Sequence, residues 1–188
     1  VSGGRWGAIN ALPSGFSDAK IKTIWTAVSE DYSPFSINVT TIRSLYDNAN
    51  IKRRIMVIFT PTTDAAPGAG GVAYLNSFND GRGDPCWSFG QSTKAAEEAA
   101  AHECGHSFGL NHDGTSSQEY YPGHGSSSTG WGPIMGAVYF KPIVQWSKGE
   151  YTDANNQGDD LARISGLTNG VGTEQMIMVM TLLMPRLW

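Results

Sequence analysis

The stretch from His102 to Asp113 reads HECGHSFGLNHD, and it decides most of what the sequence predicts about fold and chemistry. His102 and His106 stand four residues apart, so on a helix both imidazoles project from one face and can bind the same metal ion. Gly109 has no Cβ and allows a left-handed exit from the helix, after which His112 can return as a third ligand. Three nitrogen ligands leave one position for water, which is typical of a catalytic zinc site rather than a structural one.

Glu103, beside the first ligand, can reach an activated water without being a ligand itself, so it is the candidate general base and acid. Zinc held by three neutral imidazoles lowers the pKa of bound water from about 15.7 toward 7. Peptide hydrolysis is the natural assignment, because it needs an activated water, a stabilised oxyanion and a proton for the leaving amine. The alternatives are a zinc amidase of narrow specificity and a non-catalytic binding module stabilised by zinc. The intact Glu103 disfavours the module.

The full pattern HExxHxxGxxHD resembles the metzincin metalloproteases, and Asp113 makes it most similar to their adamalysin (reprolysin) branch. The resemblance covers about residues 15–165. It implies a methionine-containing turn beneath the zinc, for which Met135 in GPIMG is the candidate. It gives Asp113 a structural role, with a plain surface position as the alternative. Ala137 stands where two other branches place a tyrosine ligand, so we do not expect that ligand here.

The resemblance also implies a zincin-like α+β fold. We expect a twisted mixed sheet of about five strands, an active-site helix, a backing helix, and a smaller irregular C-terminal subdomain below the cleft. A chain of 188 residues is long enough for one domain with a real core. We therefore expect a single catalytic domain, with an upper part at about residues 1–112 and a lower part at about residues 113–188.

Local patterns predict where the elements lie. A helix begins after an N-cap at Ser17 and carries one apolar stripe as far as Tyr32. The continuous apolar run Ile55–Phe59 is typical of a buried central strand. The other expected elements are strands at 35–39, 71–75 and 87–89, the alanine-rich helix 95–101 that leads into the zinc motif, and a last helix at 159–164. The methionine-rich tail 176–184 is too short to cross a bilayer, and we expect a terminal strand or helix covering the lower part, or else a protein-contact surface.

The substrate of similar proteases is a polypeptide that binds extended along an exposed edge strand above the cleft. The best candidates for this edge are Gly71, Val72, Ala73 and Tyr74. Residues after Met135, including Val138 and Tyr139, should line the S1′ pocket. Their aliphatic and aromatic side chains predict an apolar P1′ preference.

The net charge of −4 and the lack of a basic cluster argue against a nucleic-acid surface. The 23 glycines and six tryptophans suit a loop-rich extracellular enzyme. The chain starts at Val1 without a leader, so we interpret it as a secreted, mature or excised catalytic domain, active as a monomer. One zinc ion is the expected cofactor.

Several smaller features have competing interpretations. Cys86 and Cys104 favour a disulfide, in agreement with secretion, and buried free thiols are the alternative. The Arg82–Asp84 tripeptide (RGD) is predicted to be a solvated turn. His124 is predicted to be a loop histidine rather than a residue of the cleft. The acidic stretch 153–160 does not match the spacing of an EF-hand, and a surface loop is expected there.

Overall fold

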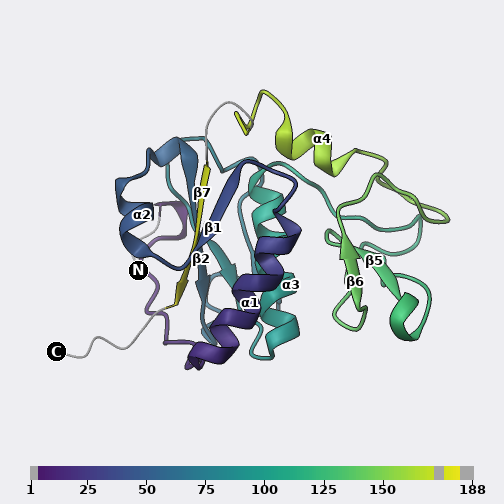
Figure 1. The fold of residues 1–188 in the computed structure, drawn as a ribbon, viewed down its shortest axis with the longest axis horizontal. Helices are drawn as coiled ribbons and strands as arrows, with labels where there is room; N and C mark the ends of the chain where they lie inside the picture. The colour runs from purple at the N-terminus through teal and green to yellow at the C-terminus, as the bar shows by residue number, and fades with distance from the viewer. Residues whose placement is uncertain (1–3, 172–175, 183–188) are drawn as a thin grey trace.

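A five-stranded sheet forms the centre of the upper part in the computed structural model, which describes residues 4–171 and 176–182 (Figure 1). The strand order is β1-β7-β2-β4-β3. Strands β1, β7, β2 and β4 run parallel, whereas β3 pairs antiparallel with β4 at one edge. This confirms the expected mixed sheet. The bounds are β1 Ile37–Thr40, β2 Arg54–Phe59, β3 Gly71–Val72, β4 Cys86–Ser88 and β7 Met176–Leu182.

Two long helices, α1 (Asp18–Asp31) and α3 (Thr93–Ser107), pack against each other and against the sheet. Each begins at a serine N-cap, because the hydroxyls of Ser17 and Ser92 accept from the backbone N–H groups of Lys20 and Ala95. Val28, Tyr32, Val57 and Cys104 are all fully buried between these layers. The backing helix and the active-site helix are therefore present where the sequence predicted them. The shorter helical elements are η1 Gly4–Trp6, α2 Arg43–Asn48, η2 Ile51–Arg53, η3 Ser127–Thr129 and α4 Asp160–Ser165.

The lower part contains a small parallel sheet of β5 (Trp131–Pro133) and β6 (Ile143–Gln145), which lies on the other side of α1 and α3 from the large sheet (Figure 1). It is attached to α1 directly. The indole Nε1 of Trp146 donates to the backbone carbonyl of Asp31 at 2.6 Å, and its ring contacts Tyr32 edge-on. Among the described residues, no helix is both long and apolar enough to cross a bilayer.

The tail forms a strand, as expected, but β7 lies inside the large sheet between β1 and β2, so the expectation that the tail covers the lower part was wrong. It pairs in parallel with β1 on one side and β2 on the other. Met178 and Val179 are fully buried there, because the interior of a parallel sheet takes apolar residues on both faces. The chain thus returns to the upper part after the lower part, and residues 183 and 184 of the predicted tail lie outside the described residues.

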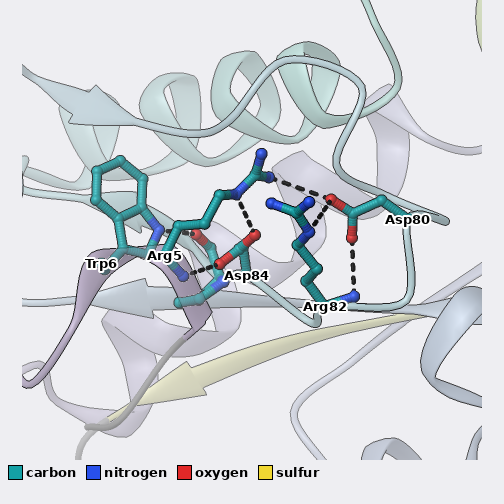
Figure 2. A network of polar contacts seen from close by, with 6 residues as sticks. Arg5, Trp6, Asp80, Arg82 and Asp84 are labelled. Atoms are coloured by element: carbon teal, nitrogen blue, oxygen red, sulfur yellow. Dashed lines mark hydrogen bonds and ion pairs between the residues drawn. The ribbon is translucent and has the colours of Figure 1, made fainter.

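The N-terminal segment is fastened to the loop before β4, and Figure 2 shows the contacts. The backbone N–H and Nε of Arg5 donate to the carboxylate of Asp84 at 2.7 and 2.8 Å. The Asp84 side chain is 0% exposed, so the predicted solvated turn was right for the exposed Arg82 and wrong for Asp84. Arg5 compensates the burial of this carboxylate, whereas Arg82 faces Asp80. The tripeptide therefore does not present its aspartate to a partner.

Both cysteines are free, buried thiols, so the favoured disulfide was wrong and the alternative holds. The Sγ of Cys86 donates to the carbonyl of Glu103 at 3.4 Å, which holds β4 against α3. Burial raises the pKa of Cys86 well above its ordinary value, and the thiol stays neutral.

The predicted strand at 71–75 is shorter in the structure, because β3 ends at Val72. The ring of Tyr74 turns to the N-terminal segment instead. It lies 4.3 Å from the Trp6 ring and 3.8 Å from the guanidinium carbon of Arg5.

Candidate metal centre

Helix α3 ends in the turn that the sequence predicted. Gly109 has φ +94°, a conformation that L side chains rarely adopt. Its N–H donates to the His106 carbonyl at 2.9 Å, and the N–H of Leu110 donates to the Gly105 carbonyl at 3.1 Å. A Cβ on Gly109 would also lie 2.2 Å from Oδ1 of Asn76. Both the backbone conformation and the close approach of Asn76 therefore require glycine at the point where the chain reverses.

This reversal brings three imidazoles together. The Nε2 atoms of His102 and His106 are 3.1 Å apart, and those of His106 and His112 are 3.0 Å apart. One ring nitrogen of each histidine lies within 4.8 Å of the others. Within the described ranges, no other set of three histidine, cysteine or carboxylate side chains meets this condition.

The opposite nitrogen of each ring fixes its tautomer. Carbonyl and carboxylate oxygens only accept, so each Nδ1 must carry the proton and each Nε2 must offer a lone pair. Three such lone pairs, two pairs of which are 3.0 and 3.1 Å apart, repel one another unless a cation lies between them, and this donor set fits Zn²⁺. The three Nδ1 donors and their acceptors are His102 to the Ile134 carbonyl (2.9 Å), His106 to the Leu110 carbonyl (2.8 Å) and His112 to the Glu119 carboxylate (2.8 Å).

Electrostatics keeps two of these imidazoles neutral, as metal ligands must be. Burial, with a further contribution from His106, lowers the pKa of His102 to about 3. Burial also lowers the pKa of His106. Both rings are therefore unprotonated at Nε2 at neutral pH.

Met135 lies beneath α3, the helix that carries His102 and His106. Its turn is closed by the Gly136 N–H, which donates to the Pro133 carbonyl at 2.9 Å. Its side chain is fully buried against Gly105, where a Cβ would stand 2.6 Å from the sulfur. The Met135 carbonyl accepts from the N–H of Asp113 at 2.8 Å. The turn thus supports the helix and the segment after His112 at once.

The Glu103 side chain lies against the edge strand β3. It is 7% exposed, and burial raises the pKa of its carboxyl to about 8. A Cβ on Gly71 would lie 2.8 Å from its Oε1. Edge strand β3 therefore runs directly past this carboxyl group.

A cavity of about 730 Å³ opens beside the edge strand. Tyr139 and Phe140 form one wall, and the Tyr139 hydroxyl would be 3.0 Å from a Cβ on Gly70. Val138 does not line the cavity, because it is buried with its Cγ1 against Gly132. The remaining lining residues come from 68–70 and from the start of α3: Gly68, Ala69, Gly70, Gly90, Ser92, Lys94 and Ala95.

Asp113 is fully buried and accepts from the side-chain amide of Asn156 at 3.0 Å. Two polar residues near Asn156 in the sequence also form hydrogen bonds with the segment that follows His112. Asn155 accepts from the Gly114 N–H, and Asp153 accepts from the N–H and hydroxyl of Ser116. The stretch 153–160 therefore fastens the chain that follows the third histidine.

Sequence reasoning missed two residues that contact His112. Glu119 accepts from its Nδ1, and the ring of Tyr120 lies 4.2 Å from its ring. Both belong to an irregular segment without periodicity, so no local pattern points to them. His124 lies outside the cluster. Its Nδ1 and the Tyr121 hydroxyl share a hydrogen bond of 3.0 Å, and its ring lies near Trp131.

A family model described as metallo-peptidase family M12 matches residues 21–147, which is more than half of the chain. The matched region includes most of α1, all of α3, the three clustered histidines and Met135. Comparison with curated proteins found no match, and comparison with solved structures found none either.

Proposed function

The chain belongs to metallopeptidase family M12, and on that premise we propose that it is a zinc-dependent endopeptidase of the metzincin type. One observation carries the proposal: the Nε2 lone pairs of three imidazoles converge where the chain turns back after α3. His102, His106 and His112 are the proposed zinc ligands. When bound, a zinc ion supplies a Lewis acid that polarises the scissile carbonyl and lowers the pKa of water.

Glu103 is the proposed general base and acid. Its carboxylate takes a proton from the attacking water and then delivers it to the leaving amine. Burial supports this role, because it raises the pKa of Glu103 to about 8, where the group can both accept and release a proton near neutral pH.

Met135 is the proposed methionine of the turn beneath the metal. Its contact with Gly105 holds the ligand helix at a fixed height above the turn. The Ile134 carbonyl in the same turn accepts from His102, so the turn also orients one ligand ring.

We propose that a polypeptide substrate binds extended along β3, through the backbone of Gly71, Val72, Ala73 and Tyr74. The position of Gly71 against Glu103 supports this, since a strand added there passes the base. The Tyr74 ring is covered by Arg5 and Trp6, so only its backbone is offered.

The cavity lined by Tyr139 and Phe140 is the proposed S1′ pocket, with a preference for an apolar P1′ side chain. Phe140 is 96% exposed at its rim, where it can cover such a side chain. A P1′ peptide library tests this. Selection of acidic or basic residues would contradict it.

We propose that these parts form one catalytic domain that acts outside the cell as a monomer. The contacts of Trp146 with Asp31 and of His102 with Ile134 join the two parts, which supports a single unit. M12 family members are often extracellular, which supports secretion.

The decisive test is cleavage of unfolded casein with and without a zinc chelator, followed by zinc add-back, in wild type and in Glu103→Gln. We expect chelator-sensitive cleavage in wild type, and a variant that retains zinc without turnover. The matched control variant, Glu30→Gln, removes an exposed carboxylate on α1 and should cleave casein as wild type does. Zinc binding without casein cleavage would favour the amidase or the binding module. The module is already disfavoured, because its RGD turn buries Asp84.

A further inference from the structure

The three clustered histidines do not share the same kind of support. His102 and His106 donate from Nδ1 to backbone carbonyls, which belong to the Met135 turn and to the turn that follows α3. His112 lies beyond the helix and donates to a side chain, the carboxylate of Glu119, at 2.8 Å. The third ring is therefore the one whose orientation depends on a separate, charged group.

The loop around Glu119 is shaped to place it there. The Thr115 N–H donates to the Gln118 carbonyl at 2.8 Å, and the Tyr121 N–H donates to the Asp113 carbonyl at 2.7 Å. Between these two bonds, Glu119 meets the edge of the His112 ring and Tyr120 covers its face. The backbone thus presents two consecutive side chains to one imidazole.

We infer that Glu119 is a positioning residue that holds His112 in the metal-binding tautomer and raises its affinity for zinc; this inference rests on the proposed function. A charged acceptor at Nδ1 fixes the ring orientation and makes Nε2 a stronger electron donor. In its absence water would take the place of the carboxylate, and the ring would be free to turn. Loss of such an outer partner weakens metal binding about 10- to 100-fold.

The Glu119 side chain is 68% exposed, and this separates metal binding from folding. An exposed ion pair contributes little to stability. Removing this carboxylate should therefore leave the metal-free fold intact while it weakens the metal site. A residue with a merely structural role would show the reverse.

The test measures the zinc dissociation constant of the whole chain by competition with a chromogenic chelator. We expect Glu119→Ala to bind zinc roughly 10- to 100-fold more weakly than wild type, and Glu119→Gln, which keeps an uncharged acceptor, to lie between them. The control Glu30→Gln removes the same charge from an exposed position on α1 and should match wild type. The visible spectrum of the Co²⁺-substituted protein should shift in Glu119→Ala, shift less in Glu119→Gln, and stay unchanged in Glu30→Gln.

The outcomes separate the two ideas. If wild type binds no zinc, the proposed function fails and this inference fails with it. If wild type binds zinc tightly and both Glu119 variants bind it equally well, only the role of Glu119 is overturned. If Glu119→Ala binds zinc poorly, thermal unfolding of the metal-free proteins distinguishes a positioning role from a structural one. A lowered melting temperature in both variants would overturn the positioning role in favour of a structural one.

Discussion

The α-carbon of Gly71 lies so close to the side chain of Glu103 that a Cβ there would stand 2.7 Å from its Cγ and 2.8 Å from its Oε1. The same Cβ would lie 2.6 Å from the carbonyl oxygen of Trp87. The edge strand and the buried carboxyl group are thus in contact through the one residue type that leaves room for both. In the proposed mechanism, this contact sets the distance between the substrate strand and the general base.

Gly71→Ala should therefore reduce activity without removing the metal. The added methyl group must push Glu103 or β3 aside, and a displacement near 1 Å can lower kcat/KM about 100-fold. Peptide cleavage and zinc content, measured on the same preparation, check this. The control is Gly158→Ala, which lies outside the proposed site and whose Cβ would meet only Oδ1 of Asn156 at 3.2 Å, so its effect on activity should be much smaller. Full activity in Gly71→Ala would show that the contact is unimportant.

Gly105→Ala should destabilise the fold. A Cβ at this position meets the Met135 sulfur at 2.6 Å, and overpacking of this kind costs about 1–3 kcal/mol. Urea denaturation gives the free energy of unfolding. Shortening Met135 in the double variant Gly105→Ala/Met135→Ala should relieve the clash. The losses of unfolding free energy in the two single variants should therefore add up to more than the loss in the double variant. Strict additivity would place the strain elsewhere.

Local geometry explains what the sequence could predict. The spacing of His102 and His106, the left-handed turn at Gly109 and the N-cap at Ser17 depend only on nearby residues, and all three have the expected structure.

Long-range pairing explains what the sequence could not predict. The apolar tail was recognisable, but its position between β1 and β2 depends on partners more than 100 residues earlier. Asp84 is buried only because Arg5 reaches it from the N-terminal segment. Glu119 reaches His112 through an irregular loop. No periodic pattern marks such contacts.

Asp31→Asn should stabilise the protein at alkaline pH. Burial, and then the charge of Glu98, raises the pKa of Asp31 from 3.8 to about 7. The folded state therefore binds this proton more tightly than the unfolded state. Stability falls as the pH rises from about 4 to 7, and the loss persists above that window. Asparagine removes the charge, so the variant should gain roughly 1–3 kcal/mol at pH 8.

Urea denaturation at pH 8 and at pH 4 checks this prediction for Asp31. The gain should vanish at pH 4, where the wild-type carboxyl is protonated in the folded state. Asp64, an exposed carboxylate that does not act on Asp31, serves as a control, and Asp64→Asn should change stability little at either pH. An equal gain from Asp31→Asn at both pH values would rule out ionisation as its cause.

Zinc should stabilise the fold through the three histidines. In the absence of metal, their Nε2 lone pairs face one another at 3.0 and 3.1 Å, an arrangement that only a cation makes favourable. A ligand that binds only the folded state at about 1,000 times its Kd adds about 4 kcal/mol. Chelation should therefore lower the melting temperature, and added zinc should restore it. His112→Ala should greatly weaken this response, whereas Glu103→Gln should keep it, because Glu103 is not a proposed ligand. A melting temperature that zinc does not change in wild type would mean that the three rings do not bind the metal together.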